Sequence, residues 1–266
     1  MERQRKRQRK CLALARTVQY NPEKDELTWR RIDMGSLRDI HTVAMTELKK
    51  RFSLNNVVLK HPFPERPLRL LGLVKIEGDV FSSEQFSRVV MMRSYMLVRT
   101  VYSIFVRPRM ELDLPVLSCE TVIGGKKTMF LVDVHRAGGG ERPGDAEFFD
   151  KLVKIRGQYP HLMKGATALK GKIQSVFSRA VCLVNITREE DPYALNLFKE
   201  YFALYLEMVE KASPLTGDAL VQARKAYEEY LATIVEHDPG VRMYKLLFGK
   251  RGGEARALDI FFAVDD

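Results

Sequence analysis

The feature that most constrains the fold is a pair of strand-like runs joined by Gly124-Gly125. Residues 116–123 and 128–134 are rich in β-branched and apolar side chains, and two glycines between such runs are typical of a β-hairpin turn. Two more segments of this kind, 68–80 and 87–107, precede the hairpin. The middle of the chain therefore predicts antiparallel strands that are neighbours in sequence.

Helical patterns lie on both sides of these strands. Apolar side chains recur at helical spacing over residues 34–52, with Ser36 as the expected N-cap. One more strand is expected at 180–186. The other predicted helices span residues 146–153, 191–211, 218–235 and 241–248, and residues 255–262 follow them as the last segment. Strands in the middle with helices before and after them predict a layered α/β domain with antiparallel connections.

The chain is basic, with a formal net charge of +10 over 266 residues. The first ten residues hold six Lys or Arg and one Glu, a net +5, so the remainder is also about +5. Such a block is typical of a solvated tail. We therefore expect a basic, mobile segment over residues 1–33 and a single domain over 34–266, with an acidic partner.

Several classes of protein are not expected. The cysteines Cys11, Cys119 and Cys182 are far apart and no HExxH motif occurs, which argues against a disulfide framework or a zinc site and favours a reducing, cytoplasmic compartment. No apolar window suits a membrane span or a signal peptide. The glycine-rich stretch 137–144 lacks a phosphate-loop motif and predicts a surface loop. RNP-like or helix-turn-helix signs of nucleic-acid binding are missing.

Three acids stand out by their positions. Glu120 lies in the middle of one predicted strand, Asp133 lies in its hairpin partner, and Asp238 stands at a helix boundary before Pro239. Glu120 could lie on a solvated sheet face, and Asp238 could simply cap the next helix. If these acids line a cleft instead, burial should raise their pKa values and allow them to donate protons.

Two groups of motifs resemble the ferredoxin-dependent bilin reductases, most closely the two-acid phycoerythrobilin synthase type. The first is Leu114–Glu120 followed by the strand Phe130–Val134. The second is the helix Phe198–Met208 and the segments after it. These segments are Asp238-Pro239, Phe248-Gly249 and Ile260–Phe262. The resemblance covers roughly residues 68–266.

The resemblance implies a three-layer α/β/α sandwich with a central antiparallel sheet. A biliverdin-like linear tetrapyrrole would lie between the sheet and the C-terminal helices of a monomer. The protein would bind no flavin, nicotinamide or metal, and electrons would come singly from reduced ferredoxin. Glu120 and Asp238 match the acids that protonate the bilin. The residues expected to contact the substrate are Ser103, Cys119, Asp133 and Arg242.

The motifs also depart from the family pattern. Leu117, Ser118 and Glu120 replace the Phe, Gly and Asp of the first motif, and the extra methylene of Glu120 moves its carboxylate. Ser103 stands where some members have His, which argues against the His-dependent reaction type. A tetrapyrrole-binding protein without activity and a reductase of another open-chain tetrapyrrole, such as a chlorophyll catabolite, stay open. Basic residues expected on the ferredoxin-docking face are Arg107, Arg109, Lys126, Lys127, Lys245, Lys250 and Arg251.

Overall fold

The computed structural model describes residues 16–21, 26–31, 35–67, 73–137, 142–168 and 171–262. Most of the basic N-terminal segment, the start of the strand predicted at 68–80, and residues 138–141 of the glycine-rich stretch lie outside these ranges. Within them, no helix is long and apolar enough to cross a membrane.

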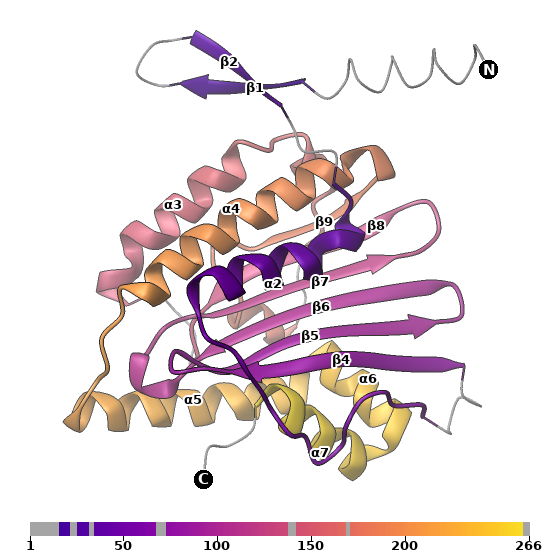
Figure 1. Ribbon diagram of the computed structural model, residues 1–266, viewed down its shortest axis with the longest axis vertical. Helices are drawn as coiled ribbons and strands as arrows, with labels where there is room; N and C mark the ends of the chain where they lie inside the picture. Colours follow the sequence, from indigo (N-terminus) through magenta and orange to yellow (C-terminus); the bar gives the residue numbers. More distant parts are fainter. Residues whose placement is uncertain are drawn as a thin grey trace.

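A seven-stranded antiparallel sheet forms the centre of the molecule (Figure 1). Its strands follow one another in sequence order, each paired with the next, as the apolar runs predict. They are β3 (Asn55–Asn56), β4 (Val74–Ser82), β5 (Phe86–Met96), β6 (Arg99–Pro108), β7 (Val116–Ile123), β8 (Thr128–His135) and β9 (Cys182–Ile186). A separate two-stranded sheet pairs β1 (Arg16–Asn21) with β2 (Glu26–Arg31).

Two tight turns lie at the same end of the sheet. The predicted hairpin joins β7 to β8, and Gly125 adopts a positive φ of 73° there, a conformation that glycine tolerates best. The other turn, Leu97-Val98, joins β5 to β6 without any glycine, so the apolar run 87–107 folds back on itself. A Cβ on Gly124 would lie 2.5 Å from the Val98 carbonyl oxygen, so the two turns are in contact.

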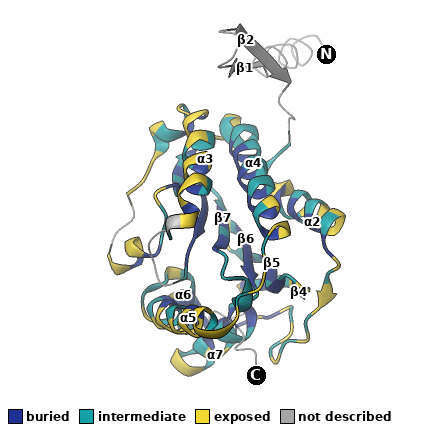
Figure 2. Cartoon of the chain, turned by 90° about the vertical axis from the view of Figure 1, so that its left-hand side faces the viewer, coloured by how far each residue is buried: buried dark blue, intermediate teal, exposed yellow. Residues whose placement is uncertain are grey.

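Helices cover both faces of the sheet, which confirms the three-layer α/β/α sandwich (Figures 1 and 2). We call the side covered by α2 (Ile40–Arg51), α3 (Ala146–Gly157) and α4 (Asp191–Glu210) the α4 face. The opposite side, the α5 face, is covered by α5 (Gly217–His237), α6 (Pro239–Phe248) and α7 (Lys250–Phe261). Short 3-10 helices are η1 (Leu37–Asp39), η3 (Met110–Leu112), η4 (Pro143–Asp145), η5 (Leu162–Gly165), η6 (Lys172–Ser175) and η7 (Arg188–Glu190).

The α4 face holds the larger apolar core. Helix α4 buries Leu195, Phe198, Phe202 and Leu206 along one stripe, as the helical spacing predicts. These side chains pack in one cluster with alternate residues of the strands, such as Phe130. Burying an aliphatic or aromatic side chain of this size stabilises the fold by about 1.5–3 kcal/mol each. This face therefore fixes the sheet on which the other face is built.

The junction between α5 and α6 lies at Asp238. It ends α5 in an extended conformation and caps α6, accepting a hydrogen bond at Oδ1 from the Val241 amide at 2.9 Å. Pro239 follows at the first helical position, where proline is favoured. Lys245 Nζ donates to the Val235 carbonyl at 2.7 Å. The Asp-Pro pair is therefore a helix boundary, as its capping chemistry predicts.

Candidate active site

A row of side chains crosses the α5 face from β5 to β8. The cross-strand register pairs Met92 with Ser103, Ser103 with Glu120, and Glu120 with Leu131. Side chains alternate between the faces along each strand, so all four point to the same side. Ser103 and Glu120 are thus neighbours on the sheet, and Glu120 faces the helices of the C-terminal region.

Glu120 has an unusual pKa for a carboxylic acid. Burial between the sheet and the helices, and to a lesser extent the negative charge of Asp238, together raise this pKa to about 7. The side chain nevertheless keeps partial exposure, so a ligand can reach it. A carboxyl group with this pKa is protonated in about half of the molecules at neutral pH and can donate a proton.

Asp238 faces the same space from the helical side. Burial raises the pKa of Asp238, while hydrogen bonds from the Val241 and Gly240 amides and the positive charges of His135 and Arg242 act in the opposite direction. Because the charge of Asp238 acts on the pKa of Glu120, the two predicted acids lie within electrostatic range of one another. One comes from the middle of the sheet and the other from a helix junction 118 residues later in the chain.

The four predicted substrate-contacting residues lie in different places. Ser103 lies beside Glu120 on the α5 face, and the exposed Arg242 lies one turn beyond Asp238 on α6. Cys119 points to the α4 face, buried in its apolar cluster, so it does not belong to this site. That prediction failed because adjacent strand residues face opposite sides of a sheet.

Asp133 is also unavailable to a substrate, although it lies on the α5 face. It is fully buried, and its carboxylate accepts hydrogen bonds from the Ser178 amide at 3.0 Å and the Ser178 hydroxyl at 2.6 Å. These bonds tie the loop after η6 to the sheet. Asp133 therefore holds the wall of the site, and the expectation that it contacts the substrate is corrected.

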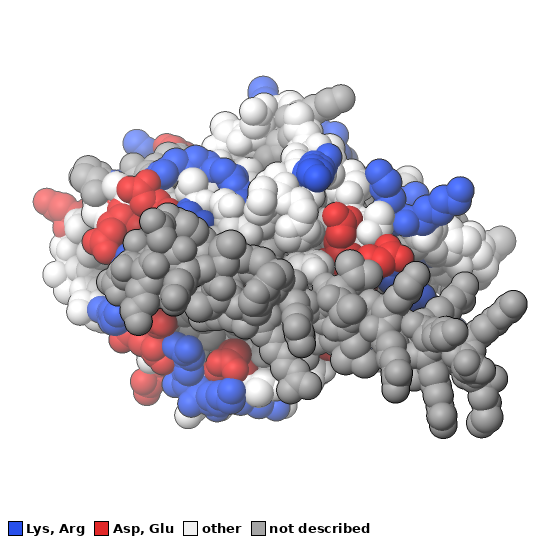
Figure 3. Space-filling model, turned by 90° about the horizontal axis from the view of Figure 1, so that it is seen from above, with Lys and Arg blue, Asp and Glu red and all other residues white. Residues whose placement is uncertain are grey.

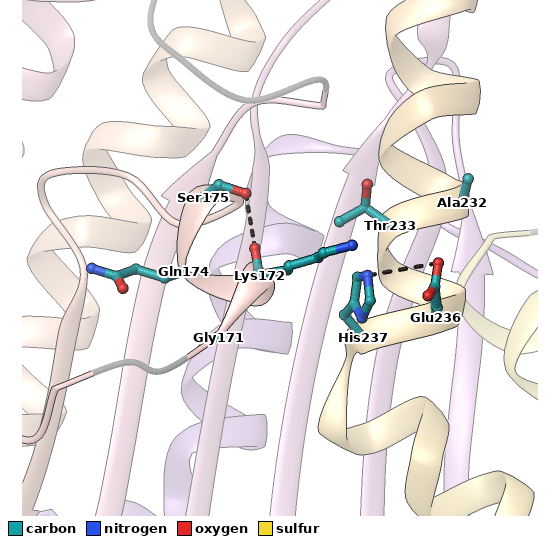
Figure 4. A pocket seen from close by; sticks show the side chains of 8 residues that line it. All are labelled: Gly171, Lys172, Gln174, Ser175, Ala232, Thr233, Glu236 and His237. Atoms are coloured by element: carbon teal, nitrogen blue, oxygen red, sulfur yellow. Dashed lines mark hydrogen bonds and ion pairs between the residues drawn. The ribbon is translucent and has the colours of Figure 1, made fainter.

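A cleft of about 790 Å³ opens between η6 and the C-terminal end of α5 (Figure 4). Lys172 extends from η6 across the cleft towards α5, where His237 lies next to Asp238 in sequence (Figure 4). The volume falls within the range of small-molecule sites. The lining residues are Gly171, Lys172, Gln174, Ser175, Ala232, Thr233, Glu236 and His237.

Sequence reasoning missed several polar residues of the α5 face. His135 is 3% exposed, and its Nε2 lies 3.0 Å from the hydroxyl of Tyr230 on α5. Ser118 precedes Glu120 by two residues, and among the described residues its buried hydroxyl has no hydrogen-bond partner. The spacing itself was available: His135 follows Asp133, and Ser118 precedes Glu120, at the two-residue interval that places side chains on one face.

The residues that the structure describes offer no cluster of metal ligands. They contain no group of three or more His, Cys, Asp or Glu side chains arranged to hold a metal ion. The expectation that the protein works without a bound cofactor stays a prediction.

Comparison with protein families finds a match over most of the chain. A profile described as "Ferredoxin-dependent bilin reductase" matches residues 41–262. The match begins within α2, so it extends further towards the N-terminus than the sequence motifs, which begin near residue 68.

Individual relatives are distant. Phycoerythrobilin:ferredoxin oxidoreductases of Prochlorococcus marinus strains MIT 9301 and MIT 9312 are each 22% identical over 186 residues, which is 68% of this chain and 73% of theirs. Among solved structures, phytochromobilin synthase from tomato in complex with biliverdin superposes with a TM-score of 0.72 at 16% identity. That match covers 84% of this chain and 80% of the tomato chain, and it shows a shared fold.

Proposed function

Because this chain belongs to the ferredoxin-dependent bilin reductase family, we propose that it reduces a double bond of a biliverdin-like linear tetrapyrrole. Each reduced double bond takes up two electrons and two protons. Ferredoxin supplies the electrons one at a time, and Glu120 and Asp238 supply the protons. The observation that supports this assignment is the pair of partly exposed acids on facing elements, both with raised pKa values.

A proton donor must hold its proton at the pH at which it works. An ordinary carboxyl group is almost fully ionised at pH 7, whereas Glu120, with its pKa raised to about 7 by burial, keeps a substantial protonated fraction, and burial raises the pKa of Asp238 in the same direction. A bilin radical formed by the first electron would lie between these two donors. The two acids would then act from opposite sides of the tetrapyrrole, one from the sheet and one from the helix junction.

The cleft beside Asp238 offers the space for such a substrate. A linear tetrapyrrole is a long, largely apolar molecule with carboxylate side chains, and the cleft has the volume for it and one cationic side chain, Lys172, in its lining. Lys172 supplies a positive charge from η6, and Arg242 supplies another on α6, one turn beyond Asp238. Charges at these places would hold the carboxylates at the edge while the pyrrole rings lie over Glu120.

Electrons must enter near the site, and the sheet end with the two turns is the place we assign to ferredoxin. Leu97 and Val98 are 78% and 80% exposed there. Exposed Arg99, Lys126 and Lys127 lie next to them. Glu120 is only three residues from the end of β7, about 10 Å along the strand. An apolar tip with a basic border fits an acidic electron carrier.

Two other residues of the predicted docking set, Arg107 and Arg109, do not share this surface. Arg107 is buried, with its guanidinium 4.2 Å from the ring centre of Tyr227, and so cannot dock a partner. Arg109 follows β6 at the opposite end of the sheet. In the view of Figure 3, basic and acidic side chains are interspersed over the uncovered surface. Net charge alone therefore does not select a docking face there.

The test is an anaerobic absorption time course with biliverdin and a reduced-ferredoxin system. We expect the biliverdin band to disappear as a new, blue-shifted product forms. A spectrum that shifts on binding but never turns over would instead indicate a tetrapyrrole-binding protein or another tetrapyrrole substrate. No shift at all would contradict the proposal.

The docking surface is tested by charge reversal. Lys126→Glu with Lys127→Glu should slow ferredoxin-driven turnover about 10-fold or more at low salt, and less at high salt. The matched control is Lys154→Glu with Lys211→Glu, two exposed lysines of the α4 side that should have little effect. Turnover that is equally fast in both double variants, or that does not depend on salt, would show that ferredoxin docks elsewhere.

A further inference from the structure

A second pocket lies on the α4 face, on the other side of the sheet from Glu120 and Asp238. It has a volume of about 500 Å³ and opens between α2 and the strands β4 and β5. This volume falls within the range of small-molecule sites. The wall residues that bear on its chemistry are His41, Met45 and Lys49 on α2, Glu77, Asp79 and Phe81 on β4, and Met91 and Arg93 on β5.

Helix α2 turns two neighbouring stripes towards the sheet. One stripe is apolar, and its residues Ala44 and Leu48 are buried in the core cluster of the α4 face. The other stripe, His41, Met45 and Lys49, follows one position later at the same four-residue spacing and lines the pocket. The packing that fixes α2 on the sheet therefore also fixes one wall of the pocket.

Arg93 is a cation on the inner side of a strand. Met91, two residues earlier on the same side of β5, is buried in the apolar cluster. The Arg93 guanidinium lies 4.9 Å from the ring centre of Tyr102, and its Nη1 donates to the Tyr95 hydroxyl at 3.1 Å. Neutral groups thus hold the guanidinium in place without neutralising its charge.

The charges that line the pocket favour an anion. Glu77, whose charge also acts on Arg93, is ion-paired with Lys75. Asp79 is exposed, so solvent screens its charge. Among the described residues, no acid makes an ion pair with Arg93 or with Lys49. Two cations of the wall are therefore left to pair with a bound molecule.

His41 adds a neutral ring to the same wall. Its ring meets that of Tyr102 edge to face, with the ring centres 5.4 Å apart. Burial and then the charge of Arg93 lower the pKa of His41 to about 4, so the ring carries no charge at neutral pH. His41 Nε2 and Arg93 Nε are buried, and neither has a hydrogen-bond partner among the described residues. Buried polar atoms usually have partners, so the wall is incomplete as it stands.

We propose that this pocket binds a small organic carboxylate with a flat, apolar body, at a site separate from the bilin cleft. The planar guanidinium of Arg93 suits a bidentate contact with the carboxylate, and Lys49 adds a second positive charge from the exposed side. The apolar body lies against Met45, Phe81 and Met91. This inference does not depend on the function proposed above.

The first measurement follows the amide resonances of the full-length, isotope-labelled protein by two-dimensional NMR as benzoate is added. Benzoate combines a carboxylate with a flat apolar ring, and benzamide has nearly the same shape without the charge. We expect saturable shifts that are largest around His41, Glu77 and Arg93. Benzamide should bind about 10-fold or more weakly than benzoate, because it lacks the charged hydrogen bonds.

Three variants locate the carboxylate. Arg93→Met keeps an apolar stem and removes the charge, so benzoate should bind about 10-fold or more weakly. Lys49→Met changes an exposed helix position at little risk to folding, and it should weaken binding about 2-fold to 5-fold. Arg188→Met removes an exposed arginine that does not line the pocket, and this matched control should bind benzoate as the parent does.

The outcomes that overturn the inference are distinct. They are the absence of saturable shifts at the wall residues, equal affinities for benzoate and benzamide, and an affinity that stays unchanged in Arg93→Met and Lys49→Met. Biliverdin added to the benzoate-loaded protein should leave the shifts in place. If biliverdin displaced benzoate instead, the pocket would not be a separate site and the inference would fail.

Discussion

The two faces of the sheet are built from the same strands but differ in chemistry. On the α4 face the largest buried side chains are apolar or have their polar atoms paired: the Tyr201 hydroxyl donates to the Ala180 carbonyl at 2.7 Å, and the Tyr205 hydroxyl lies 3.2 and 3.1 Å from the Val106 and Pro115 carbonyls. On the α5 face the strands place a partly exposed acid and a buried histidine. The comparison shows how one sheet separates stability from reactivity: one side fixes the strands so that the other can hold groups that a stable core would exclude.

The largest effect is expected for Asp238→Asn. Asparagine still caps a helix and leaves the shape of the site intact, but it cannot release a proton. Turnover should fall about 100-fold to 10,000-fold, the range for losing an acid catalyst, with a coloured bilin radical accumulating. Stopped-flow absorption checks this result, with Asp79→Asn on the exposed side of β4 as the control. A variant that forms normal product at the normal rate would remove Asp238 from the mechanism.

A substitution that creates a large cavity on the α4 face should lower the stability of the fold without changing the rate of turnover. Phe202→Ala, at a position 1% exposed, should lower the free energy of unfolding by about 3–5 kcal/mol. Turnover per folded molecule should stay within a few-fold of the parent. Denaturant unfolding and rate measurements on the folded fraction separate the two effects. A selective loss of turnover would show that the faces are coupled more closely than their separate clusters suggest.

Glu120→Gln should make the protein more stable above neutral pH. The pKa of Glu120 is about 7 in the folded protein, against an ordinary value of 4.5 in the unfolded chain. Between these two pH values the unfolded chain binds fewer protons than the folded protein does. The free energy of unfolding of the parent protein therefore falls as the pH rises from about 4.5 to about 7. At pH 8 the variant should gain about 1–2 kcal/mol, a figure that allows for the partial exposure of the side chain. At pH 4 the difference should vanish. Thermal unfolding across this range provides the measurement; a gain independent of pH would contradict the sign.

The smallest expected effect is the difference in stability cost between removing a tyrosine hydroxyl on the α4 face and removing one on the α5 face. Tyr205→Phe removes a hydroxyl placed between two backbone carbonyls and should cost about 1 kcal/mol. Tyr244→Phe removes a hydroxyl that donates to the Met92 sulfur at 3.0 Å, a weak acceptor, and should cost less. Denaturant midpoints of the two variants give the comparison. Equal costs would mean that the α5 face uses its hydrogen bonds as fully as the α4 face.

Much of the fold could be predicted from local patterns. The Gly-Gly hairpin, the helical stripe of α4 and the Asp-Pro boundary depend on turn chemistry, spacing and capping, which short stretches of sequence contain. The Leu97-Val98 turn could not be predicted in this way. Its two residues are ordinary strand formers, and the pairing of Met96 with Arg99 is what defines the turn.

The site was only partly predictable. The family motifs identified Glu120 and Asp238, yet the pattern of residues alone left each with an ordinary structural explanation. Their meeting depends on α5 and α6 packing over the sheet, a long-range contact that no local pattern describes. The prediction that Cys119 contacts the substrate was wrong because side chains alternate between the two faces along a strand, and this alternation could have been applied to the sequence. The partner of His135, Tyr230, comes from a helix 95 positions away and required the structure.

The position of Asp238 at a helix joint has a mechanical consequence. An ionised carboxylate accepts hydrogen bonds from helix amides more strongly than a protonated one does. The junction between α5 and α6 should therefore be most mobile while Asp238 is protonated and most rigid once Asp238 has released its proton. The same chemical event that completes a reduction would tighten the wall of the cleft, so that the mobility of the joint reports how far each catalytic cycle has advanced.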